Sequence, residues 1–376
     1  MPLPSLSIGS LTARLPIIQG GMGVGVSLSG LASAVANAGG IGVIATPGIG
    51  WQEPDFHSDY VAANTRALRK QIRAAKEKTK GIIGVNIMVV LTNFAQLVRA
   101  AVEERIDIIF SGAGLPLNLP EYVDKTSSTR LVPIVSSARA AKILCRKWLS
   151  RYNRLPDAFV VEGPKAGGHL GFKPECLDDE AFSLEQLVPE VVKVVAPFEE
   201  ESGQRIPIIA AGGVYTGADI RKFLDLGASG VQMGTRFVAT DECDADDAFK
   251  QAFVNADEKS LTIVKSPVGM PGRAIRNEFL DAVENGAKIP FSCPFHCIQT
   301  CEHKNSPYCI ALALLNARKG SMKHGLVFAG ANAHRIKSIV PVETLMKSLQ
   351  DEYEQSRPAA DATTVGEDLP IEAVLP

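Results

Sequence analysis

Residues 206–217, IPIIAAGGVYTG, join a short apolar run to a glycine turn, and this unit predicts the fold. The run has no polar alternation, as expected of a strand in a parallel sheet that is covered on both faces. Seven further runs of this kind occur along the chain, with helical stretches between them. They begin at Leu15, Gly40, Gly81, Ile106, Arg130, Asp157 and Gly230.

Eight strand–helix units in succession favour an α/β fold of the TIM (β/α)8 barrel type, because repeated units of this kind close more readily than they form an open sheet. A doubly wound open sheet remains the alternative, since its strands are also apolar. We expect residues 1–240 to form the barrel and residues 241–354 to form a cysteine-bearing C-terminal extension or lid over its mouth. Residues 355–376 are rich in Pro, Ala, Asp and Glu without a regular period, which predicts a disordered tail.

The composition excludes several classes of function. A formal net charge of −2 over 376 residues gives no general basic field, so a nucleic-acid role has no electrostatic support. The N-terminus has no cationic start followed by a long apolar run, and no stretch is apolar enough to span a membrane. We therefore expect a cytoplasmic protein. Seven cysteines, an odd number, argue against a disulfide framework.

Residues 162–172, EGPKAGGHLGF, place His169 at the end of a glycine-rich turn that directly follows the strand run beginning at Asp157. Glycines allow the backbone to approach a ligand closely, and imidazole is the side chain best suited to move a proton near neutral pH. His169 is therefore the candidate catalytic residue. The alternative is a structural histidine in a surface loop.

Three glycine-rich turns follow strand runs, at residues 20–25, 210–217 and 231–237, and none has the GxGxxG spacing of a dinucleotide site. The last two occupy the usual phosphate position of a barrel, where turns present backbone N–H groups. The predicted phosphate cradle comprises Gly212, Gly213, Gly234 and Thr235. In the first turn, Met22 lies between glycines that would let the backbone lie against a flat ring, and Asn86 offers amide groups to the ring's polar edge. Together these features predict FMN.

Four of the cysteines crowd into one short segment with the spacing C-x3-C-x3-C-x7-C: Cys293, Cys297, Cys301 and Cys309. Four thiolates are enough for a [4Fe-4S] cluster or for tetrahedral zinc. Zinc sites more often use C-x2-C pairs, so the spacing favours iron–sulfur. Zinc, or no metal at all, remains an alternative.

A basic helical stretch lies between residues 64 and 80. Arg66, Arg69, Lys70 and Arg73 fall at i, i+3, i+4 and i+7, so they share one helix face. We expect an acidic partner such as an acyl carrier protein to dock there. The alternative is an ordinary solvated helix face.

The runs PIIQGGMG, GVNI, EGPKAGGHLGF, IIAAGGVYTGADI and GASGVQMGTRF together resemble the nitronate monooxygenase (2-nitropropane dioxygenase) superfamily, which also holds the FMN-dependent enoyl-acyl-carrier-protein reductases. The resemblance extends from about residue 8 to residue 345. It implies a TIM barrel with FMN at its mouth and His169 as the catalytic histidine. The FMN contacts that it implies are Gly21, Met22, Gly23, Asn86, Lys142, Glu162, Gly167, Gly212, Gly213, Gln232, Met233, Gly234 and Thr235.

Residues 266–279, SPVGMPGRAIRNEF, and the cysteine segment resemble the branch that contains flavin and iron–sulfur acyl-acyl-carrier-protein dehydrogenase/isomerases. This resemblance implies oxidation or isomerisation of an acyl thioester with His169 as general base. Three alternatives remain open: a nitronate monooxygenase that uses O2, an enoyl-acyl-carrier-protein reductase, and a flavin redox sensor without turnover.

Overall fold

The computed structural model describes residues 2–124, 126–287, 293, 295–302 and 304–356. Eight parallel strands form one sheet in the order β3-β11-β10-β8-β7-β6-β5-β4. A parallel bridge between Ile18 and Ile41 joins the two edges of the sheet, so the sheet nearly closes as a barrel. All eight predicted strands are confirmed: β3 (Ile17–Gln19), β4 (Gly42–Ala45), β5 (Ile83–Met88), β6 (Ile108–Gly112), β7 (Arg130–Val135), β8 (Phe159–Glu162), β10 (Ile208–Ala211) and β11 (Gly230–Met233).

Successive strand residues pack on opposite faces of the sheet, which explains why the strands are apolar throughout. One set forms an interior cluster that includes Ile18, Val43, Phe110, Val160 and Ile209. Their sequence neighbours belong to the cluster between the sheet and the helices. The hairpin of β1 (Leu6–Ile8) and β2 (Leu11–Ala13) joins the interior cluster. Leu6 lies against Gly230, the first residue of β11, so the hairpin covers the N-terminal end of the barrel.

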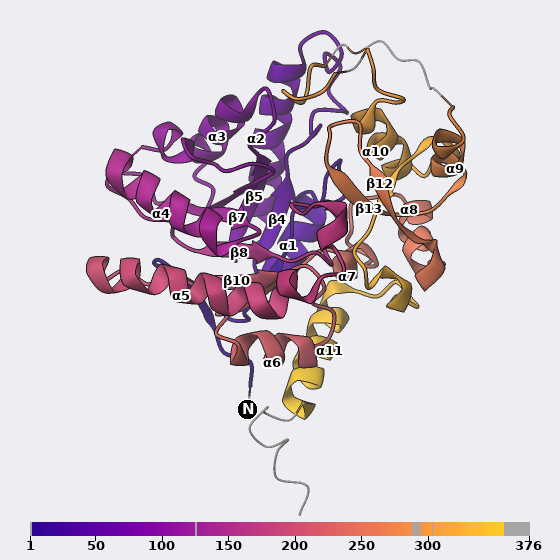
Figure 1. Cartoon of the computed structure of the whole chain (residues 1–376). Helices are drawn as coiled ribbons and strands as arrows, with labels where there is room; N and C mark the ends of the chain where they lie inside the picture. The colour runs from indigo at the N-terminus through magenta and orange to yellow at the C-terminus, as the bar shows by residue number, and fades with distance from the viewer. Residues whose placement is uncertain (1, 125, 288–292, 294, 303, 357–376) are drawn as a thin grey trace, which may run out of the picture.

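Helices surround the barrel, as Figure 1 shows. After β6 the connection contains only the 3-10 helix η1 (Leu119–Tyr122), and the helix that directly follows β11, α7 (Thr235–Val238), has only four residues. The C-terminal helix α11 (Val342–Gln355) packs against α6 and α1, where the eighth barrel helix belongs. The other barrel helices are α1 (Ser29–Asn37), α2 (Tyr60–Lys78), α3 (Phe94–Glu103), α4 (Ala138–Tyr152), α5 (Leu184–Ser202) and α6 (Gly217–Asp225).

Part of the predicted extension therefore completes the barrel, because α7 is too short to cover the sheet where β11 meets β3. Helix α11 also includes Gln355, the first residue of the predicted tail. Residues 357–376 of that tail lie outside the described residues. Within the described part of the chain, no helix has the length and apolar character needed to cross a membrane.

The rest of the extension lies on one side of the barrel, coloured orange in Figure 1. Its strand β13 (Pro271–Ile275) pairs antiparallel with β12 (Leu261–Lys265), with β14 (Val327–Phe328), and with the two-residue strand β9 (Gly168–His169). Since β9 follows the barrel strand β8, this pairing joins the extension to the loop that carries His169. The remaining elements are α8 (Asp247–Val254), α9 (Glu278–Glu284), α10 (Ile310–Arg318), η2 (Pro174–Cys176), η3 (Glu180–Phe182), η4 (Glu258–Ser260), η5 (Met322–His324) and η6 (Ala333–Arg335).

Candidate functional site

A cavity of about 1140 Å³ lies at the C-terminal ends of the barrel strands, between them and the extension. This volume exceeds the range of roughly 300–1,000 Å³ that is usual for pockets holding a single small molecule. The cavity therefore has space for a cofactor and a second ligand. It is lined by His169 and by twelve of the thirteen predicted FMN contacts: Gly21, Met22, Gly23, Asn86, Glu162, Gly167, Gly212, Gly213, Gln232, Met233, Gly234 and Thr235.

Lys142 is the exception, and its prediction as an FMN contact is not supported by the geometry. It lies on α4 with an exposed side chain and is absent from the cavity wall. Ser137 and Ala140 bring this end of α4 to the cavity. Lys142 is two residues beyond Ala140, a rotation of about 200° around a helix with 3.6 residues per turn, so it faces away.

The glycine turns form a backbone wall that side chains would obstruct. Gly212 and Gly213 have φ values of +87° and +101°, which favour glycine strongly. A Cβ on Gly212 would lie 2.7 Å from the carbonyl oxygen of Gly163, and a Cβ on Gly21 would collide with Asn86. The glycine turns therefore expose backbone to the cavity, beside the side chain of Met22 and the side-chain amide of Asn86. Backbone N–H groups suit a phosphate, and Met22 with the Asn86 amide suits a flat flavin ring.

His169 is held by residues of the extension. Its Nε2 lies 2.7 Å from Oγ of Ser266, a buried serine next to β12, and its ring meets the Phe328 ring edge-on at 5.0 Å between centroids. Burial lowers the pKa of His169 to about 4, so the imidazole is neutral at pH 7. A neutral imidazole can accept a proton from a ligand in the cavity.

Glu162, the last residue of β8, also faces the cavity. Among the described residues, no donor forms a hydrogen bond or ion pair with its carboxyl group. Burial away from bulk solvent raises the pKa of Glu162 to about 7. The carboxyl group is therefore poised between its neutral and charged forms near physiological pH.

The glycine loop before His169 is supported by a buried arginine. Arg273 of β13 donates from Nη1 to the carbonyl oxygens of Pro164 and Ala166, at 2.7 Å each. Burial lowers the pKa of Arg273 below its ordinary value. These contacts fix the backbone on both sides of Lys165.

Two further contacts join the extension to the phosphate turns. The backbone N–H of Gly330 donates to Thr235 Oγ1 at 3.0 Å, and Asn332 Nδ2 donates to the carbonyl oxygen of Gly213 at 2.7 Å. Sequence reasoning missed these supporting residues together with Ser266, Arg273 and Phe328. Residues 266–279 belong to the segment that was predicted to lie over the barrel mouth, but nothing in the sequence identified strand β13 within it or the pairing of β13 with β9.

The four clustered cysteines line one small cavity together with His296, Ile298 and Ile310. Its volume, about 10 Å³, accommodates at most one water molecule. No group of three His, Cys, Asp or Glu side chains in the described part of the chain is arranged to hold a metal ion. The structure thus brings Cys293, Cys297, Cys301 and Cys309 to one place, but this arrangement does not support the predicted [4Fe-4S] cluster.

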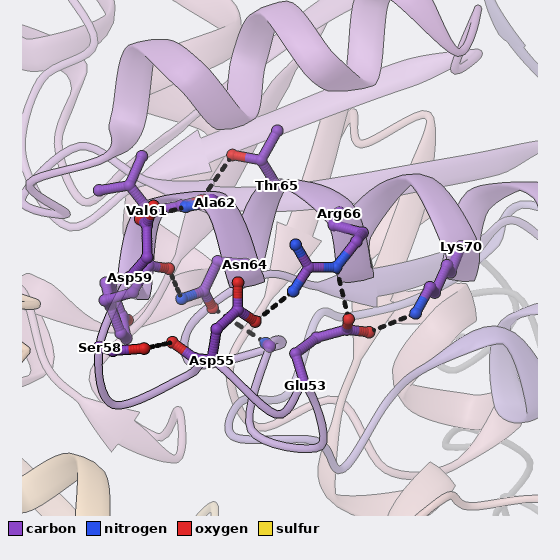
Figure 2. A network of polar contacts seen from close by, with 12 residues as sticks. Glu53, Asp55, Ser58, Asp59, Val61, Ala62, Asn64, Thr65, Arg66 and Lys70 are labelled. Atoms are coloured by element: carbon purple, nitrogen blue, oxygen red, sulfur yellow. Dashed lines mark hydrogen bonds and ion pairs between the residues drawn. The ribbon is translucent and has the colours of Figure 1, made fainter.

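The predicted docking face on α2 is neutralised by carboxylates from neighbouring segments. Figure 2 shows Arg66 bonded to Glu53 and Asp55, and Lys70 bonded to Glu53. The distance from Lys70 Nζ to Glu53 Oε1 is 2.7 Å. Farther along the helix, two more basic side chains pair with residues that end the α3 region: Arg69 with Glu103 and Glu104, and Arg73 with Glu104. Docking of an acyl carrier protein on this face stays a prediction, and an acidic partner would have to displace these ion pairs.

The barrel, its glycine turns and the neutral histidine define a class of protein: TIM-barrel enzymes that use a flavin at the C-terminal ends of their strands. The family model for nitronate monooxygenase matches residues 5–352, and the chain belongs to this family of FMN-dependent oxidoreductases.

Individual relatives have diverse names. The chain is 29% identical over 273 residues to the (3aS,4S,5R,7aS)-5-hydroxy-7a-methyl-1-oxo-octahydro-1H-indene-4-carboxyl-CoA dehydrogenase of Mycobacterium tuberculosis, a match covering 73% of this chain but only 66% of that protein. It is 28% identical over 297 residues to a probable nitronate monooxygenase of Staphylococcus aureus, covering 72% and 78% of the two chains. The structure of FabK from Thermotoga maritima aligns with a TM-score of 0.69 at 28% identity, covering 91% of this chain and 94% of FabK.

Proposed function

We propose that this oxidoreductase dehydrogenates or isomerises an acyl thioester, with His169 as the general base. The observation that carries the proposal is a neutral imidazole, fixed by Ser266, on the wall of a cavity large enough for FMN and a second ligand. The similarity to a protein named as a carboxyl-CoA dehydrogenase supports the same substrate class.

The chemistry follows from the protonation state of His169. A thioester carbonyl makes the C–H bond at the adjacent α-carbon acidic, and a neutral imidazole within reach can take that proton. If Nε2 donates to Ser266 Oγ, the lone pair on Nδ1 is left to accept it. FMN, when bound, supplies the two-electron acceptor for the hydride that leaves the β-carbon as the Cα–Cβ double bond forms. In isomerisation of an unsaturated substrate the imidazole returns its proton at a different carbon, with no net oxidation.

The cavity also has apolar walls suited to an acyl chain. Leu115, Phe172, Phe182 and Leu187 are among the residues that line it. The rings of Phe172 and Phe182 meet at 6.2 Å between centroids. Burying methylene groups here stabilises the complex by about 0.8 kcal/mol per CH₂. A small nitronate would leave most of these side chains without contact.

The proposal is tested by mixing FMN-loaded protein without oxygen with octanoyl-CoA and following the flavin absorbance. We expect the flavin to bleach. A flavin that stays oxidised with saturated thioesters, in a protein that also fails to isomerise an enoyl thioester, would contradict the proposal.

Nitronate monooxygenase activity is the second candidate, supported by the matching family model and by the Staphylococcus aureus relative. It predicts oxygen uptake with alkyl nitronates, and a higher kcat/KM for these than for thioesters would replace the first proposal. An enoyl-thioester reductase would instead consume NADH or NADPH with an enoyl thioester. A flavin redox sensor would show none of these activities.

The [4Fe-4S] cluster stays a prediction, which rests on the spacing of the four cysteines in the sequence. Protein purified without oxygen should contain about four iron and four sulfide per chain. Replacement of Cys297 by Ser should remove the iron, whereas Cys243→Ser, at a buried cysteine outside that cavity, should retain it. Zinc, or a protein without metal, would contradict the prediction.

A further inference from the structure

Three basic side chains near the cavity form no ion pair within 4 Å with a carboxylate of the described residues: Lys165, Arg236 and Arg335. Lys165 has a longer-range electrostatic interaction with Glu185. This contrasts with α2, where all four predicted docking cations are ion-paired. Unpaired cations that are brought close together favour an anionic ligand, because each one raises the local positive potential.

Two of these cations share one aromatic ring. The guanidinium carbons of Arg236 and Arg335 lie 4.5 and 4.2 Å from the centre of the Tyr215 ring. Tyr215 lines the cavity and follows the turn at Gly212 and Gly213. Nε of Arg236 is buried without a hydrogen-bond acceptor, so part of this guanidinium is unsatisfied.

Lys165 stands at the cavity rim, where its side chain is exposed. Its stem lies against Gly213, and its carbonyl oxygen accepts a hydrogen bond from the N–H of Ala331 at 3.1 Å. Asn332 connects the same segment to Gly213, and Arg335 follows three residues later. Lys165, Tyr215 and Arg335 therefore belong to segments that are hydrogen-bonded around one part of the rim.

We propose that Lys165, Arg236 and Arg335 bind the phosphate ester at the far end of a pantetheine arm on the thioester substrate. Guanidinium groups suit phosphate because their N–H donors match its oxygens. A site for this phosphate must be open to solvent, because that end of the ligand enters last. Lys165 and Arg335 are exposed, and Arg236 and Arg335 do not line the cavity itself. This inference rests on the proposed function. The same phosphate ester occurs in CoA and on a carrier protein, so both sources present one chemistry to the site.

The test compares three octanoyl thioesters with FMN-loaded protein: those of CoA, of an acyl carrier protein, and of N-acetylcysteamine, which has no phosphate. Lys165→Met and Arg335→Met keep an apolar stem and remove the charge. Each should weaken equilibrium binding of free CoA and raise the KM for the first two thioesters by about tenfold, the scale of one charge-assisted hydrogen bond. The kcat values and the KM for the N-acetylcysteamine thioester should not change. Lys347→Met on α11, at an exposed lysine, is the matched control.

The outcomes separate this inference from the proposed function. Unchanged CoA binding in both variants would overturn the site. Weaker binding of FMN with unchanged binding of CoA would also overturn it, since the phosphate would then be that of the cofactor. An effect confined to the carrier-bound thioester would overturn it too, because the cations would be contacting the carrier's surface. Charge-dependent CoA binding in a protein that turns over no thioester would support the site while the proposed function failed.

Discussion

Replacement of Ser266 by Ala removes the hydroxyl that lies 2.7 Å from Nε2 of His169. The imidazole nitrogen would lose its partner in a buried place, and leaving such a group unsatisfied costs about 1–3 kcal/mol. At 1.36 kcal/mol per factor of ten, the rate of proton abstraction should fall roughly 10- to 100-fold if the loss falls on the transition state. Ser266 does not line the cavity, so we expect kcat to fall and KM to stay close to its wild-type value.

The assay is flavin reduction by octanoyl-CoA in a stopped-flow instrument without oxygen, over a range of pH. The affinity for FMN and the circular dichroism spectrum report whether the variant folds and retains its cofactor. Ser150→Ala, at an exposed serine on α4, is the matched control and should behave as wild type. If Ser266→Ala reduced its flavin within twofold of the wild-type rate while binding FMN normally, the hydroxyl would have no part in positioning His169.

Three further predictions concern stability and cofactor binding. Burial raises the pKa of Glu162 from 4.5 to about 7, so the free energy of unfolding of the native apo-protein falls as the pH rises from about 4.5 to 7. Glu162→Gln removes this titration. In urea unfolding it should raise the free energy of unfolding by up to about 3 kcal/mol at pH 8 and leave it unchanged at pH 4. An equal change in the free energy of unfolding at both pH values would contradict the raised pKa of Glu162. The Asp244 carboxylate accepts from the backbone N–H groups of Leu28 and Leu31 at the start of α1, so Asp244→Ala should cost about 1–2 kcal/mol in the same assay, and a loss below 0.5 kcal/mol would contradict this capping role. Gly21→Ala should collide with Asn86, cost about 1–3 kcal/mol and weaken FMN binding, and unchanged FMN affinity would argue against this turn as the flavin wall.

The strands and the glycine turns could be predicted because their signals are local. An apolar run of a few residues followed by Gly, as at residues 206–213, contains both the strand and the turn that ends it. The barrel then brings the ends of all eight strands together, so Asn86, Glu162 and Gln232 line one cavity although they are far apart in the chain.

The residues that hold His169 could not be predicted, because they depend on pairing over long distances. Strand β9 has two residues, and its register with β13 places Gly272 opposite His169 about a hundred positions away. The cations of α2 illustrate the same limit, since their helical spacing was visible but Glu53 and Glu104, which neutralise them, approach only in the folded chain. Lys142 was misplaced because its position around α4 depends on which face of that helix meets the cavity.

The central claim, that the neutral imidazole of His169 removes the α-proton of an acyl thioester, is tested most directly by single-turnover flavin reduction with octanoyl-CoA. His169→Gln is compared with the matched control His324→Gln, at an exposed histidine of η5. We predict that His169→Gln binds FMN normally but reduces it at least about 100-fold more slowly than wild type, whereas His324→Gln is unaffected. Flavin reduction at the wild-type rate in His169→Gln would contradict the account.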